Sequence, residues 1–183
     1  MDEQRRFIQL IVSRLDSAGI PYMLTGSMAM AVYSIPRMTR DVDLVIEVEA
    51  TEVDRLFDLF AKDCYIDREI VKEAVNAHSM FNIIHNKWVI KADFIIKKND
   101  EYRREEFSRR QKIALEDATV FVVSPEDLIL SKLVWGKQSQ SDLQLGDVRQ
   151  MISVVPKLDW QYIKKWAIIL SVDSLLQKAK NNG

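Results

Sequence analysis

The sequence predicts an α/β (α+β) core followed by a C-terminal helical region. In the first two thirds of the 183 residues, segments with apolar residues at helical spacing alternate with short runs typical of strands. The final third shows only helical patterns. Apolar residues make up 48% of the chain and charged residues 29%, which is typical of a globular protein with one sizeable core. We therefore expect a core over residues 1–123 and a helical region over residues 124–183 that packs on it.

The first half of the chain begins with an amphipathic helix. Residues 4–18 carry apolar side chains at helical spacing, and Gly19 follows as a stop signal. A short apolar run then ends at Gly26 and predicts a strand, and a segment rich in Ala and Met predicts a helix. The predicted elements after the first helix are a strand at 21–25, a helix at 27–34, a strand at 41–48, and helices at 50–62 and 67–77.

The second half begins with strand patterns and ends in helices. Strands are predicted at 79–85 and 88–97, as a hairpin around His-Asn-Lys, and as a second pair at 109–115 and 119–123. At Ser-Pro-Glu-Asp, residues 124–127, a capping hydroxyl, a proline at the first helical position and two acids in the first turn predict a helix start. Helices are expected from there to about Gly136 and at 141–153, 159–170 and 172–180.

Charge and composition narrow the classes of function. The chain has 26 Lys and Arg against 27 Asp and Glu, a formal net charge of −1, so no global basic field favours nucleic-acid binding. The N-terminus is charged and amphipathic, and no apolar run approaches the roughly 20 residues that cross a membrane. The single cysteine, Cys64, permits no internal disulfide and is expected to be a packing residue. We expect a cytoplasmic protein with no membrane partner.

Two aspartates interrupt the apolar strand predicted at 41–48. Because side chains alternate along a strand, Asp41 and Asp43 share one face, while Val42 and Leu44 point into the core. Two carboxylates held that close repel each other unless a cation lies between them, and a divalent metal ion is the usual one. An isolated Asp-x-Asp is more often only the polar face of a half-exposed strand, so the neighbouring motifs decide between the two interpretations.

Two further features accompany the aspartate pair. Gly26 and Ser27 lie at a strand-to-helix junction, where glycine allows close backbone approach and the helix start offers N–H groups to a phosphate. Asp93 is the only acid of its strand and interrupts an apolar run. If its strand lies beside the first aspartate strand, Asp93 can bind a metal ion or accept the proton of an attacking hydroxyl; otherwise it is a polar-face residue. Together these features predict a site for a metal-bound nucleoside triphosphate.

This order of motifs resembles the nucleotidyltransferase superfamily typified by DNA polymerase beta and kanamycin nucleotidyltransferase. The order is Gly-Ser, a short helix, two aspartates separated by one residue on the next strand, and a lone acid on a later strand. The stretch RMTRDVDL, residues 37–44, resembles a variant of small bacterial nucleotidyltransferases, including the toxins of type IV toxin–antitoxin and abortive-infection systems. The tail SPEDLILSKLVWGKQSQSDLQLGDVRQMI is also similar to those proteins. The motif match covers about residues 20–97, and the tail extends it to about residue 170.

The resemblance implies a nucleotidyltransferase fold, with a short mixed β-sheet flanked by helices, and two-metal catalysis. Asp41 and Asp43 would bind two magnesium ions, with Mn²⁺ as a substitute. Asp93 would be the third ligand or the general base. All three acids are present, which argues against an inactive copy.

The resemblance also implies which residues bind the nucleotide. Gly26 and Ser27 would hold the β and γ phosphates, Arg37 and Thr39 match the variant motif, and Lys132 matches a tail lysine that would face the triphosphate. Better-known small members often carry an arginine soon after Gly-Ser, where this chain has Met-Ala-Met-Ala. The phosphate charge must therefore be met by Arg37, Arg40, Lys91 or Lys132.

The expected function is transfer of a nucleoside monophosphate from a triphosphate such as ATP to an unidentified hydroxyl acceptor: RNA, protein or a small molecule. The alternative is a nucleotide-binding or interaction module without chemistry, in a toxin–antitoxin cassette with a small protein partner. A hydrolase using the same acids fits the triphosphate cradle less well. Arg103, Arg104, Arg109, Arg110 and Lys112 form a basic cluster that could contact RNA, but the interspersed glutamates favour a self-paired, solvent-exposed face.

Overall fold

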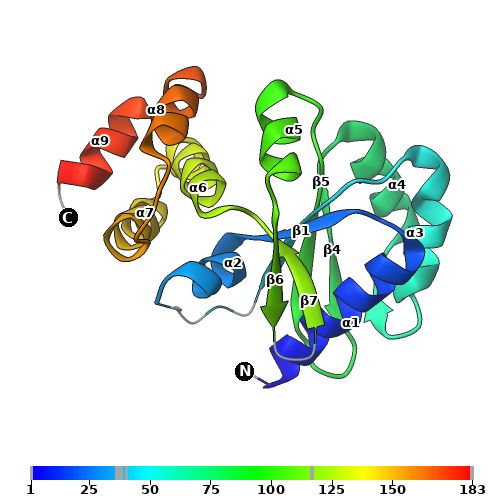
Figure 1. Cartoon of the computed structure of the whole chain (residues 1–183). Helices are drawn as coiled ribbons and strands as arrows, with labels where there is room; N and C mark the ends of the chain where they lie inside the picture. Colours follow the sequence, from blue (N-terminus) through cyan, green and yellow to red (C-terminus); the bar gives the residue numbers. More distant parts are fainter. Residues whose placement is uncertain (1, 36–38, 40, 116–117, 182–183) are drawn as a thin grey trace.

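The computed structural model describes residues 2–35, 39, 41–115 and 118–181. These residues form a seven-stranded sheet with helices around it (Figure 1). The strands are β1 (Tyr22–Thr25), β2 (Val42–Ile46), β3 (Cys64–Tyr65), β4 (Met80–His85), β5 (Lys91–Ile96), β6 (Gln111–Leu115) and β7 (Ala118–Val122). Their order across the sheet is β3-β4-β5-β2-β1-β7-β6.

The sheet is mixed, as expected. β2 pairs in parallel with β5 and antiparallel with β1, and β1 pairs in parallel with β7. The predicted hairpins are confirmed as the antiparallel pairs β4–β5 and β6–β7. The two aspartate-bearing strands, β2 and β5, are therefore neighbours at the centre of the sheet.

Helices surround the sheet and continue beyond it. They are α1 (Asp2–Ala18), α2 (Gly26–Tyr33), α3 (Val53–Phe60), α4 (Arg68–Ala77), α5 (Glu101–Ser108), α6 (Pro125–Ser139), α7 (Asp142–Val154), α8 (Trp160–Ile169) and α9 (Asp173–Asn181), with a 3₁₀ turn at Ala50–Glu52. Figure 1 shows α1, α3 and α4 together at one end of the molecule and α6–α9 grouped at the other. α2 contacts β2 on one side and α6 and α7 on the other, so it links the sheet to the helical region.

The core forms where the sequence pattern places it. In α1, Phe7, Ile11 and Leu15 are fully buried at helical spacing. In β2, Val42, Leu44 and Ile46 are buried and alternate with the half-buried Asp43 and Val45, so the Asp43 side chain lies on the opposite face from Val42. Cys64 is buried, and burial raises the pKa of its thiol to about 11, as suits a packing residue.

The fold differs from the sequence-based expectation in several features, one of which is the short strand β3, which has no counterpart among the predicted elements. α5 was not predicted, because its sequence EYRREEFS is too charged to show an apolar stripe; it begins at the cap Asp100, whose side chain accepts a hydrogen bond from the Arg103 N–H. The strand expected at 41–48 begins at Val42, so Asp41 lies just before it. None of the helices described in the structure is long and apolar enough to cross a membrane.

Candidate active site

The parallel pairing of β2 and β5 brings two of the predicted acids together. Asp43 and Asp93 lie directly opposite each other in the register of the two strands. Asp93 is only 7% exposed, and its Oδ1 atom is buried without a hydrogen-bond partner among the described residues. A buried, unpaired carboxylate oxygen is costly, so this atom is suited to accept a ligand.

A lysine lies among the three aspartates. The Lys91 Nζ atom is 2.8 Å from Asp93 Oδ2 and 3.6 Å from Asp41 Oδ2. The hydrogen bond to Asp93 raises the pKa of the Lys91 ammonium group, so Lys91 stays charged at neutral pH. The side chain of Asp41 is half exposed, whereas that of Asp93 is nearly buried.

The neighbouring acids raise the proton affinity of the Asp43 carboxylate. Burial, and then the negative charges of Asp93 and Asp41, raise the pKa of the Asp43 carboxyl group to about 6. The positive charges of Lys91 and Lys132 act in the opposite direction. The site therefore carries excess negative charge that a bound cation would offset.

Gly26 closes one side of this cluster. Its φ angle is +64°, in the left-handed region that favours glycine, and it opens α2 directly after β1. A Cβ atom at this position would lie 2.0 Å from Asp43 Oδ2, so only glycine lets the aspartate lie here. Within the described structure the N-cap Thr25 makes no side-chain capping hydrogen bond, so its hydroxyl does not compete for the first-turn N–H groups of α2.

The donor chemistry fits a divalent cation. As the side chains stand, no group of three or more His, Cys, Asp or Glu among the described residues is placed to hold a metal ion. Asp41 and Asp93 nevertheless both contact the Lys91 ammonium group, and Asp93 Oδ1 has no hydrogen-bond partner among the described residues. The raised pKa of Asp43 indicates surplus negative charge at the same place. Carboxylate oxygens are the ligands that Mg²⁺ and Mn²⁺ prefer.

The other residues predicted to bind the nucleotide lie in different parts of the chain and are not all described by the structure. Ser27 is in the first turn of α2 and half buried, and the carbonyl of Thr39 accepts a hydrogen bond from Gln4 Nε2 at 3.2 Å. Arg37 and Arg40 lie outside the described residues. Lys132 is buried in α6, and its charge lowers the pKa of Asp43.

The ammonium of Lys132 is also held within the helical region. Its Nζ atom is 2.6 Å from Asp147 Oδ2 and 3.3 Å from Gln144 Oε1, both on α7. The pair joins α6 to α7, and Lys132 thereby adds positive potential to the acid cluster from the helical side. The acid that pairs with it was not identified as a site residue from sequence.

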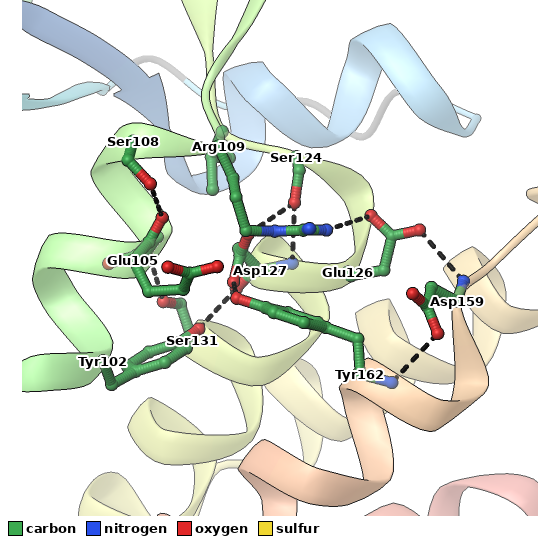
Figure 2. Close-up of polar contacts among 12 residues, drawn as sticks. Tyr102, Glu105, Ser108, Arg109, Ser124, Glu126, Asp127, Ser131, Asp159 and Tyr162 are labelled. Carbon is green, nitrogen blue, oxygen red and sulfur yellow. Dashed lines mark hydrogen bonds and ion pairs between the residues drawn. The ribbon is translucent and has the colours of Figure 1, made fainter.

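Two arginines of the basic cluster at 103–112 form ion pairs with buried acids. Figure 2 shows Arg109 beside Asp127, Glu126 and Tyr162, where its Nε atom lies 3.1 Å from Asp127 Oδ2 and its guanidinium lies 3.8 Å from the centre of the Tyr162 ring. Arg103 pairs with the buried Glu106 at 2.7 Å. Self-pairing with glutamate is thus confirmed for Arg103, but the expectation of a solvent-exposed face is wrong for both arginines, because their partners are buried between helices.

Solved structures with the same fold are nucleotidyltransferase-like proteins. An antigenic nucleotidyltransferase-like protein from Paracoccidioides brasiliensis is 19% identical, with a TM-score of 0.59, and the match covers 98% of this chain and 92% of that one. The antibiotic-resistance factor ANT(2'')-Ia is 13% identical, with a TM-score of 0.59 and full coverage of both chains. The lincosamide antibiotic adenylyltransferase LnuA, solved with lincomycin, is 10% identical, with a TM-score of 0.55, and covers 84% of this chain and 97% of its own.

Neither a family model nor a curated protein matches the sequence. The structural likeness extends over the whole chain, including the helical region, in two of these three comparisons. At identities of 10 to 19% it establishes the fold alone. The chain has the fold of the nucleotidyltransferase superfamily.

Proposed function

We propose that this protein transfers a nucleoside monophosphate from a nucleoside triphosphate to a hydroxyl group, with Asp41, Asp43 and Asp93 as the metal-binding acids. The observation that carries the proposal is the register of β2 and β5, which sets Asp43 opposite Asp93. Two further observations support it: Gly26 at the start of α2 lies against the Asp43 carboxylate, and Asp93 Oδ1 has no hydrogen-bond partner among the described residues. The fold supports the same class of reaction.

Each residue has a proposed role in this reaction. Asp41, Asp43 and Asp93 would hold Mg²⁺ or Mn²⁺ as two ions, which would supply Lewis acidity for the acceptor hydroxyl and neutralise the triphosphate. Gly26 and Ser27 bind the β and γ phosphates through the first turn of α2. Thr39, Lys132 and, by resemblance, Arg37 contact the nucleotide.

The transfer conserves atoms and charge. The acceptor oxygen bonds to the α phosphorus, the bond between that phosphorus and the bridging oxygen breaks, and pyrophosphate leaves with the electron pair. The proton of the acceptor hydroxyl passes to Asp93 or to water. Preorganised acids and phosphate-binding N–H groups supply the positioning on which phosphoryl-type transfer depends.

The proposed acceptor is a hydroxyl group on RNA, on a protein or on a small molecule. Two structures with this fold are, by their names, a lincosamide antibiotic adenylyltransferase and an antibiotic-resistance factor, which favours testing small hydroxyl compounds beside RNA and protein. The resemblance to toxin nucleotidyltransferases adds a small protein partner to the proposal. The single, buried cysteine suits the reducing cytoplasm, which we propose as the compartment.

The decisive experiment incubates the protein with each α-labelled nucleoside triphosphate, MgCl₂, and separate pools of RNA, cell protein and small hydroxyl compounds. We expect pyrophosphate release and label in one pool, reduced at least about 100-fold by Asp43→Asn or Asp93→Asn. Asp58→Asn, an exposed change on α3, should leave the rate unchanged. Undiminished labelling in the Asp43→Asn variant rules out this site. Magnesium-dependent ATP binding without pyrophosphate release favours the non-catalytic nucleotide-binding module.

A further inference from the structure

Lys91 places an ammonium group inside the acid cluster. It lies between Asp93 and Asp41, at 2.8 Å and 3.6 Å from their Oδ2 atoms, while its side chain is 37% exposed. The side chain of Asp93 is only 10% exposed, so the carboxylate end of the shorter ion pair is shielded from solvent. A shielded ion pair is held more firmly than one on the surface.

The backbone register fixes this arrangement. Val42 lies opposite Ala92 and Asp43 opposite Asp93 in the parallel pair, so Asp41 and Lys91 meet at the start of the two strands. Asp-x-Asp on β2 thus faces Lys-x-Asp on β5, with alternate residues on one face. Three carboxylates and one ammonium leave a local charge that a divalent ion offsets, yet the ammonium already holds Asp93.

We propose that Lys91 is an internal counter-ion that competes with divalent metal ions for Asp93 and so sets the metal affinity of the site. The inference rests on the metal-dependent function proposed above. An ammonium group and a divalent cation repel each other strongly at contact distance. A metal ion that binds Asp93 must therefore displace Lys91, and in the metal-free protein Lys91 keeps the three acids together.

The opposite end of the same two strands offers a matched control. Lys97 follows β5 and forms an ion pair with Glu47, which follows β2. Like the longer pair of Lys91 with Asp41, it joins a lysine on the β5 side to an acid on the β2 side, and it lies four residues beyond the last acid on each strand. Neutralising Lys97 removes a similar ion pair without touching the acid cluster.

The test is calorimetric titration of MgCl₂ into the nucleotide-free full-length protein. We expect Lys91→Met to bind Mg²⁺ at least about 10-fold more tightly than the wild type, and Lys97→Met to match the wild type. Lys91→Arg, which keeps the charge, should bind no more tightly than the wild type. Unchanged or weaker Mg²⁺ binding by a folded Lys91→Met variant overturns the proposal, and so does tightening by Lys91→Arg.

A measurement on the wild type covers the case in which Lys91→Met does not fold. Saturating MgCl₂ should free the Lys91 amine and raise its acylation rate several-fold by mass spectrometry, with Lys97 unchanged. An acylation rate of Lys91 that does not rise overturns the proposal.

The transfer assay separates this inference from the proposed function. Tighter Mg²⁺ binding by Lys91→Met without any nucleotidyl transfer in the wild type supports the counter-ion and refutes the activity. Transfer that requires Asp43, together with unaltered Mg²⁺ affinity in Lys91→Met, supports the activity and refutes the counter-ion.

Discussion

The Asp43 carboxyl group carries most of the electrostatic cost of the candidate site. Burial and the charges of Asp93 and Asp41 raise its pKa to about 6 from an ordinary value of 3.8. The folded protein therefore binds this proton more tightly than the unfolded chain does. The resulting stabilisation is fully present below pH 3.8 and is lost as the pH rises through about 6.

Replacing Asp43 by Asn should reveal this cost. Without metal, we expect Asp43→Asn to be more stable than the wild type by on the order of 1 to 3 kcal/mol at pH 8, since the amide does not ionise. The gain should shrink through pH 6 and vanish near pH 4. Urea unfolding in EDTA at the three pH values measures it, with Asp58→Asn as a solvent-exposed comparison that stays near zero. A gain equal at pH 4 and pH 8 would show that the effect is packing rather than charge.

Gly26 is the second residue on which the site depends, and the chain contains its own control. Gly19 has nearly the same φ angle, +65° against +64°, but the Cβ added there meets no described atom within 4 Å. At Gly26 that Cβ would meet the Asp43 carboxylate. Gly19→Ala should cost about 1 kcal/mol of backbone strain, and Gly26→Ala at least about 2 kcal/mol more, with loss of nucleotidyl transfer. Thermal unfolding and the transfer assay measure both; equal losses in the two variants would contradict the crowding argument.

At the scale of elements, the sequence predicts where β2 and β5 lie along the chain but not that they pair with each other in the sheet. The acids of β2 and β5 are visible as polar residues in apolar runs, but their contact joins positions 43 and 93, and no local pattern encodes that pairing. The contact of Lys91 with Asp93 had a sequence signal, because Lys91 lies two residues before Asp93 and thus on the same face of a strand. The crowding of Gly26 against Asp43 had none, because it depends on the antiparallel register of β1 and β2.

α5 was missed for a related physical reason. Its glutamate and arginine side chains look like a solvated surface, whereas Glu106 is buried and paired with Arg103. A buried ion pair has the same residue types as an exposed one, so composition does not distinguish them. Only the packing of α5 against α6 assigns these charges to the interior, through the hydrogen bond from Arg103 to Ser131.

Two arginines of the basic cluster should therefore differ in their effect on stability. Arg109 lies on Asp127, which is fully buried, whereas Arg104 is exposed and donates to the backbone carbonyl of Asn99. We expect Arg109→Ala to lower the free energy of unfolding by about 2 to 4 kcal/mol and Arg104→Ala by less than about 0.5 kcal/mol. Urea denaturation measures both. A comparable small loss in both variants would return the cluster to a surface role and reopen RNA binding.

At the scale of the whole molecule, the helical region is tied to the core at the start of α6, where Arg109 of the core pairs with Asp127. Ser124 caps the helix and donates a hydrogen bond to Asp127 at 2.6 Å, and Tyr162 of α8 donates to the same carboxylate at 2.6 Å (Figure 2). Further along α6, Lys132 pairs with Asp147 of α7 while its charge acts on Asp43. α6 thus both holds the helical region together and contributes the positive charge of Lys132 to the candidate site. The division between residues 123 and 124 that the sequence predicts stays a proposal.

Two variants separate a structural role of Lys132 from a role in nucleotide binding. Lys132→Met leaves Asp147 buried beside an apolar side chain, so we expect a loss of about 3 to 5 kcal/mol in the free energy of unfolding. Lys132→Met with Asp147→Leu removes both charges, and most of that stability should return. Lys137→Met, an exposed lysine on the same helix, should cost less than about 1 kcal/mol. Nucleotidyl transfer by the double variant then decides the role of the ammonium: if Lys132 faces the triphosphate, KM for the nucleotide rises at least about 10-fold although the protein is stable. Wild-type KM and kcat in a stable double variant would remove Lys132 from the nucleotide site and leave it as the link between α6 and α7.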